Sequence, residues 1–408
     1  MQVPTEIYDH IVYRVWNVYN EFLYLADDAR KYATFEGRAR RDLANLRLVN
    51  RAFCRSASPW LFRHVNAECT STLVTPPLER LIQLSKSPYA TCVCQIDFGF
   101  KESLPSDTST LYIEALAEWH SFLLVKFTNL RALGFHEPPL SLPQAQKAVY
   151  MEIAISILRY VPLPNLSELE VRFSITHDFG RFFPNEINSL QIPIEDILQH
   201  LRHLELCVCA YTDSADQRRR QTPVLPEYAA LPNGTYAPHL FRMVENAPKL
   251  KSLILSSVNI LDFDSVTFPS TVCLESLHLG GVSISSDVLL SLINQSAHKM
   301  KYIGFWLVKL KSGTWQQVLL QLCKLPRLLD INIDYGGYTL TGSSSHLADR
   351  LFPSPECRPD IETMHNLDLI ELGNLQWQVN SNRIAMGLQP FPDTDYQHIN
   401  KPSLEFEG

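Results

Sequence analysis

The feature that most constrains the fold of this chain is a short pattern of aliphatic residues that recurs from about residue 87 onward. Each copy reads aliphatic, two variable, aliphatic, one variable, aliphatic. The last two aliphatic positions are two residues apart, so in a strand they lie on one face. Clear copies begin at Leu166, Leu201, Leu250, Leu274, Met300 and Leu328, and weaker copies begin at Val93, Leu130 and Leu367.

The period of this pattern predicts the fold class. The central copies lie about 24 to 28 residues apart, which is within the period of leucine-rich repeats. Between the copies, segments 149–158, 287–295 and 314–322 have the composition and apolar spacing of helices. The chain therefore resembles leucine-rich-repeat proteins. The resemblance implies an α/β fold, in which a solenoid carries a parallel sheet on its concave side and helices on its convex side.

A second pattern occupies two segments near the N-terminus. In the first, Pro4 fits the start of a helix, with Glu6 and Asp9 near the positive end of the helix dipole. The second segment, 42–65, has apolar residues at helical spacing and a proline that ends the run. Its spaced apolar residues are Leu43, Leu46, Val49 and Phe53.

Together these segments resemble an F-box of the fungal type, with a matching close at 61–65. The matching residues are Pro4, Glu6, Ile7, Ile11, Asp42, Leu43, Val49, Arg51 and Phe53. The resemblance implies docking to a Skp-type adaptor, and through it to a cullin, by a helix-in-groove contact. We expect the adaptor to contact Pro4, Ile7, Ile11, Leu43, Leu48, Val49 and Phe53. The alternative for each is a core position in a small helical domain.

The F-box pattern is interrupted by about twenty-five residues, 15–40, and a continuing apolar stripe there predicts an extended first helix. Because single cores stop growing at roughly 250 to 300 residues, 408 residues fit one small and one large unit. We expect a helical domain at 1–66 and repeats at 67–375, with a proline-rich inserted loop at 211–238. A capping helix at about 375–386 and a frayed tail would then make up 376–408.

Composition excludes several function classes. A net charge of −7 and a pI near 6.0 argue against general binding to nucleic acids or anionic membranes. The sequence has no run of eighteen apolar residues and no secretory signal pattern, so we expect no membrane span and an intracellular protein, in the cytoplasm, the nucleus or both. The nine cysteines then read as reduced thiols.

No motif in the chain indicates catalysis. The Cys92/Cys94 pair, like the pair at 207 and 209, fits strand residues better than metal ligands, because no second pair follows at a suitable spacing. Cys207 near His203 is the one candidate nucleophile and base. We expect no enzyme activity, catalytic residue, cofactor or metal.

The variable positions of the repeat strands predict a binding face instead. A patch of aromatic and acidic residues there is the candidate substrate site, and it consists of His278, Tyr302, Trp306, Asp330 and Asp334. Exposed aromatic residues dominate interface energies, and the acids would select a basic segment. The alternatives are that Trp306 packs under a loop and the acids form a solvated row. The function that follows is a substrate-recognition adaptor of a Skp-cullin-F-box ubiquitin ligase, and the alternative is a leucine-rich-repeat interaction scaffold without a role in ubiquitination.

Overall fold

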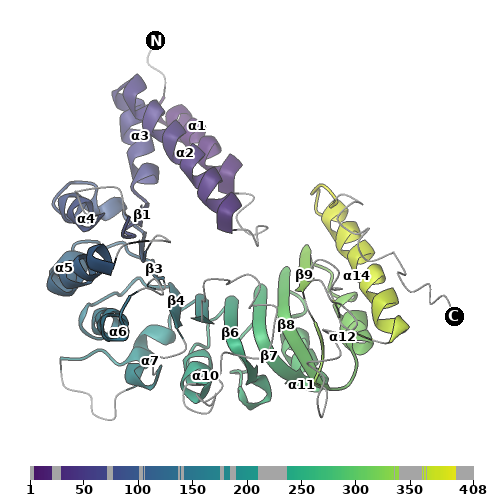
Figure 1. Ribbon diagram of the computed structural model, residues 1–408. Helices are drawn as coiled ribbons and strands as arrows, with labels where there is room; N and C mark the ends of the chain where they lie inside the picture. The colour runs from purple at the N-terminus through teal and green to yellow at the C-terminus, as the bar shows by residue number, and fades with distance from the viewer. Residues whose placement is uncertain are drawn as a thin grey trace. The chain divides into compact units, whose positions relative to one another are not determined.

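The structure is a computed structural model of the chain (Figure 1). It describes residues 4–20, 29–70, 77–100, 104, 106–136, 138, 142–174, 179–183, 190–209, 237–334, 336–339, 361, 363 and 365–391. The chain forms two compact units. The first contains 1–170 and 187–193, and the second contains 171–186 and 194–408.

The first unit begins with three helices, α1 (Thr5–Asn20), α2 (Ala29–Val49) and α3 (Arg51–Leu61). Their core is built from Val12, Leu43 and Ala57, with several larger apolar side chains packed around them. Asn50 caps α3, because its side-chain oxygen accepts a hydrogen bond from the Phe53 backbone N–H at 2.9 Å. The extended first helix is confirmed as far as Asn20, and α2 contains the second half of the interruption in the F-box pattern.

Parallel strands with intervening helices make up the rest of the first unit. The strands are β1 (His64–Asn66), β2 (Gln95–Phe98) and β3 (Ala132–Phe135), paired in chain order. The helices are α4 (Pro77–Ser85), a 3₁₀ turn at Ala90–Cys92, α5 (Ser106–Leu124) and α6 (Gln144–Tyr160). Ile96 pairs with Leu133 and both are buried, so this face of the strands is the core side. Strand β4 (Glu168–Ser174) contains the division between the units, after Glu170.

The second unit repeats this arrangement. Its strands are β5 (His203–Cys209), β6 (Ser252–Asp262), β7 (Ser276–Ser285), β8 (Tyr302–Ser312), β9 (Asp330–Asp334) and β10 (Gly337–Tyr338). Its helices are α7 (Ile194–Leu198), α10 (Ala237–Glu245), α11 (Ser286–Ser296), α12 (Trp315–Leu322) and α14 (Asn366–Ala385), with 3₁₀ turns at Phe179–Phe182 and Phe263–Ser265. Strands β5 to β8 are parallel neighbours in chain order, and both β9 and β10 pair with β8. The α/β class with a parallel sheet is therefore confirmed.

The aliphatic pattern aligns from strand to strand. Leu253 pairs with Leu277, Leu277 with Ile303, and Ile303 with Ile331. The first three of these side chains are buried, so the intervening residues form the opposite face of the strands. All six clear copies of the pattern lie at strands, as do the weaker copies at Val93 and Leu130.

Two predicted features of the second unit differ from the structure or lie outside the residues that it describes. The copy expected at Leu367 is wrong, because 366–385 is the helix α14, and the helix expected at about 375–386 therefore begins earlier. The inserted loop predicted at 211–238 lies outside the described residues except for its last two positions, which begin α10. None of the helices in the described ranges is long and apolar enough to cross a membrane.

Candidate functional site

The five predicted patch residues lie together on one face of β7, β8 and β9. Tyr302 pairs with Asp330 and Trp306 with Asp334, while His278 pairs with Gly304 between the two aromatic residues. All five predicted side chains are half-buried. The register of three neighbouring strands thus gathers residues that are up to 56 positions apart in the chain (278 to 334). We call these five residues the aromatic-acidic patch.

Two glycines give this patch its shape. A Cβ added at Gly280 would meet the Trp306 ring at 3.2 Å and the Ser256 Cβ at 2.9 Å. A Cβ added at Gly304 would collide with the His278 imidazole. The indole and the imidazole therefore each lie over a glycine of the neighbouring strand. Neither glycine was assigned to the patch from the sequence: Gly280 was expected in a turn closing a repeat strand, but it lies inside β7. The signal that could have identified their role is a small residue aligned beside a large one in the next repeat.

The acidic side of the patch is formed by β9. Asn332 lies between Asp330 and Asp334 on the same face, and its side-chain amide donates a hydrogen bond to Asp334 Oδ2 at 3.0 Å. This bond orients one carboxylate beside the aromatic residue that pairs with it. A cationic side chain with its apolar stem could thus meet a carboxylate and an aromatic ring together.

A polar row continues on β5 and β6. The Arg172 guanidinium forms an ion pair with the largely buried Glu205, with 2.6 Å between Nε and Oε1. Cys207 donates to Glu205 Oε1 at 3.4 Å and accepts from the Ser256 hydroxyl at 3.0 Å. Glu205 is thus engaged by a cation and a thiol.

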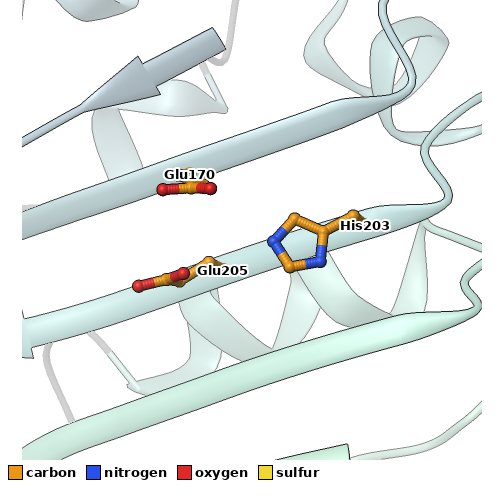
Figure 2. A group of neighbouring side chains, drawn as sticks. All are labelled: Glu170, His203 and Glu205. Atoms are coloured by element: carbon orange, nitrogen blue, oxygen red, sulfur yellow. The ribbon is translucent and has the colours of Figure 1, made fainter. Parts of the chain in front are cut away.

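His203 and Glu205 point to the same side of β5, and Figure 2 also labels Glu170 on β4. His203 Nδ1 lies 2.9 Å from the Ser252 hydroxyl oxygen. Cys207 is four residues from His203 along an extended strand, a separation of about 13 Å. The candidate pair of a nucleophile and a base is therefore not assembled. Glu205 is already paired with the Arg172 guanidinium, which supplies the positive charge that a bound metal ion would otherwise provide.

The strands of the first unit carry histidine–carboxylate pairs. His64 Nε2 lies 2.5 Å from Asp97 Oδ2, and His136 lies between Glu68 and Glu170, at 3.5 and 3.7 Å. The hydrogen bond with His136 is the main reason that the pKa of Glu68 is lowered. These pairs were not predicted, because they depend on how the four strands β1 to β4 align with one another.

The predicted adaptor contacts divide into exposed and buried residues. Leu48 is 85% exposed, and Pro4, Ile7, Ile11 and Val49 are also exposed. Phe53 is half-buried and packs edge-to-face on Tyr8, with 4.8 Å between ring centroids. The prediction for Leu43 is wrong, because this residue has no exposed surface and belongs to the helical core.

The exposed residues of this set lie at one end of the three helices. Tyr8 in the first half of α1 contacts Phe53 at the start of α3, and Leu48 and Val49 end α2 directly before the Asn50 cap. Ile7 and Ile11 are one turn apart on α1 and lie on the same side of Tyr8. We call Ile7, Ile11, Leu48 and Val49 the helical-end surface.

No model of a known protein family matches this chain, and the search of curated proteins also found no match.

Proposed function

We propose that this protein is a substrate-recognition adaptor of a Skp-cullin-F-box ubiquitin ligase. The observation that carries the proposal is the helical-end surface, whose aliphatic residues are exposed at positions that match or adjoin the F-box pattern. Exposed aliphatic residues gathered at one end of a small helical bundle are costly in water unless a partner covers them.

The adaptor would bind this end through a helix-in-groove contact. Ile7, Ile11, Leu48 and Val49 would fill apolar pockets, while polar residues around them exclude water and contribute little free energy. Phe53 would stabilise this end of the helices through its ring contact with Tyr8, without itself filling a pocket of the adaptor. Leu43 has a different role, since it holds α1, α2 and α3 together.

The remainder of the chain would form a leucine-rich-repeat solenoid that presents the substrate. Support comes from the alignment of the aliphatic positions across β6 to β9 and from the helices that connect successive parallel strands. In such a solenoid the residues between the aliphatic positions form the concave binding face.

The aromatic-acidic patch would bind a basic segment of the protein substrate. Tyr302 and Trp306 are rigid, so fixing them costs little conformational entropy, and Asp330 and Asp334 would pair with lysine or arginine. The proposed chemistry needs no catalytic residue in this chain. The adaptor would act by holding a substrate at high effective concentration beside the ligase partners that transfer ubiquitin.

Co-expression with a Skp-type adaptor tests this proposal. We expect the intact protein to co-purify with the adaptor and the Leu48→Asp variant to lose it. Leu190→Asp is the matched control, since Leu190 is 84% exposed but lies outside the helical-end surface. Equal recovery of the adaptor with both variants, or no recovery with the wild type, would count against the proposal.

The second candidate is a leucine-rich-repeat scaffold without a role in ubiquitination. It is favoured by the internal contacts of two F-box-like residues, since Leu43 is core and Phe53 packs on Tyr8. Under this alternative the wild type would capture a basic partner through the aromatic-acidic patch without recovering an adaptor or a cullin.

A further inference from the structure

Helix α14 has one face that is fixed to the second unit. Leu372, Leu375 and Val379 are buried, and α14 packs against α12 (Figure 1). The Asn382 side-chain amide donates to the backbone oxygens of Leu325 and Leu328, and the Arg383 guanidinium donates to Leu329 O and Gln389 O. The orientation of α14 is therefore determined by contacts on this side.

The opposite face of α14 is apolar and exposed. Its residues follow alternating steps of three and four positions, which is the spacing of a two-helix coiled-coil seam. In order they are Leu367, Ile370, Asn374, Trp377, Ser381 and Ile384. The four apolar members are all exposed, and Trp377 reaches 71% exposure. These exposed apolar residues are additional to Leu372, Leu375 and Val379, which already pack α14 onto its own unit.

Gly373 adds a second feature to this face. A Cβ added there would meet no atom within 4 Å, so packing inside the chain does not require a glycine. Glycine in a helix interior also lowers helix stability relative to alanine. The open space at Gly373 lies one turn from Trp377 on the same side of the helix. A large exposed ring thus sits next to a gap of the kind that could receive one.

We propose that α14 is a self-association surface that pairs antiparallel with α14 of a second copy of this chain. Aligning the two seams about a twofold axis between Leu375 and Gln376 places Leu367 opposite Ile384 and Asn374 opposite Trp377. The indole of each copy then enters the space left by Gly373 of the other. The surface is self-complementary in the way that a twofold interface requires.

The charges near the seam are compatible with this pairing. Glu371 flanks the seam and would lie opposite Asn380, so the two copies do not bring like charges together. Arg383 is buried and already donates to backbone oxygens. The seam runs from Leu367 to Ile384, about two and a half heptads, which is a small interface, and we therefore expect a concentration-dependent dimer with micromolar affinity. This inference is independent of the proposed function.

Sedimentation equilibrium of the full chain tests the proposal, over about 0.1 to 100 µM so that micromolar affinities are covered. We expect the wild-type mass to rise from 46.6 kDa toward twice that value. Since Trp377 would be a central anchor, Trp377→Glu should weaken association at least about 30-fold. Gly373→Leu should weaken it too, because it fills the gap while improving helix propensity. Trp119→Glu is the control, because Trp119 is an exposed tryptophan on α5.

Two results would overturn the proposal. The first is a wild type that stays monomeric over the whole range. If Trp377→Glu then also lowers the melting temperature, this face is covered by another part of the same chain. The second is a dimer whose affinity is unchanged in Trp377→Glu and Gly373→Leu, which would place the interface elsewhere.

Discussion

The indole of Trp306 lies over Gly280 of the neighbouring strand, close enough that a Cβ at position 280 would be 3.2 Å from the ring. His278 has the same relationship to Gly304. The two glycines leave room for both rings to lie over the neighbouring strand. The shape of the aromatic-acidic patch is therefore determined by residues that would not contact a ligand through side chains of their own.

Gly280→Ala should destabilise the chain by about 1–3 kcal/mol, because the new methyl group overlaps the Ser256 Cβ and must displace it or the indole. Denaturant unfolding followed by tryptophan fluorescence measures both the loss of stability and the change around Trp306. Gly373→Ala is the matched control and should gain up to about 1 kcal/mol, since its methyl group meets open space in a helix. Equal effects of the two substitutions would contradict the contact with Trp306.

Leu43 and Leu48 should respond in opposite ways to truncation. Leu43→Ala leaves a cavity among Val12 and Ala57 and should cost about 2–5 kcal/mol. Leu48→Ala removes an exposed side chain and should change stability by no more than about 0.5 kcal/mol. Chemical denaturation of both variants checks this difference. A large loss of stability in Leu48→Ala would mean that Leu48 is part of the core.

Asp368→Ala should weaken the attachment of the first turn of α14 to its neighbours. The buried Asp368 carboxylate accepts hydrogen bonds from the Gln316 N–H at 2.8 Å, the Tyr338 hydroxyl at 2.7 Å and the Thr363 hydroxyl at 2.6 Å. Each donor left buried without an acceptor costs about 1–3 kcal/mol. Thermal unfolding measures the loss, and Glu118→Ala, at an exposed position of α5, is the control, expected within about 0.5 kcal/mol of wild type. Similar melting of both variants would exclude this role of Asp368.

Tyr338 should make the fold sensitive to alkaline pH. Burial, followed by its hydrogen bond to Asp368, raises the pKa of Tyr338 from 10.0 to about 12. The folded state thus holds the phenol proton more tightly than the unfolded state, so this stabilisation is complete below pH 10 and is lost as pH rises from 10 to about 12.

Unfolding free energies of the wild type and Tyr338→Phe across this range measure the effect. The difference between the two proteins should shrink as pH rises, because phenylalanine has no proton to lose. A difference that stays constant between pH 10 and 12 would contradict the raised pKa.

The sequence pattern predicted the strands well for a physical reason. Aliphatic residues at repeated spacing report which side of each strand is buried, and the positions at Leu253, Leu277 and Ile303 are aligned in the sheet. The copy at Leu367 failed because aliphatic residues at offsets of three and five also fit a helix. Leu375 and Val379, which continue the helical spacing, were the signal that could have decided it.

Features that depend on contacts between elements could not be predicted in this way. The F-box resemblance grouped Leu43 with Leu48 and Val49 as adaptor contacts, but only the packing of three helices decides that Leu43 is covered and the others are not. The roles of Gly280 and Gly304 likewise depend on strand register. The grouping of the patch residues on one face was predicted, because they all occupy variable positions of the pattern that alternate with the aliphatic ones along each strand.

The most direct test of the account is affinity capture with mass spectrometry on two variants with opposite expected effects. Wild type should recover a Skp-type adaptor, a cullin and substrate proteins with basic segments. Leu48→Asp should lose the adaptor and cullin but keep the substrates, whereas Trp306→Ala with Asp330→Ala should lose the substrates and keep the ligase partners. Recovery of neither adaptor nor cullin with the wild type would contradict the account.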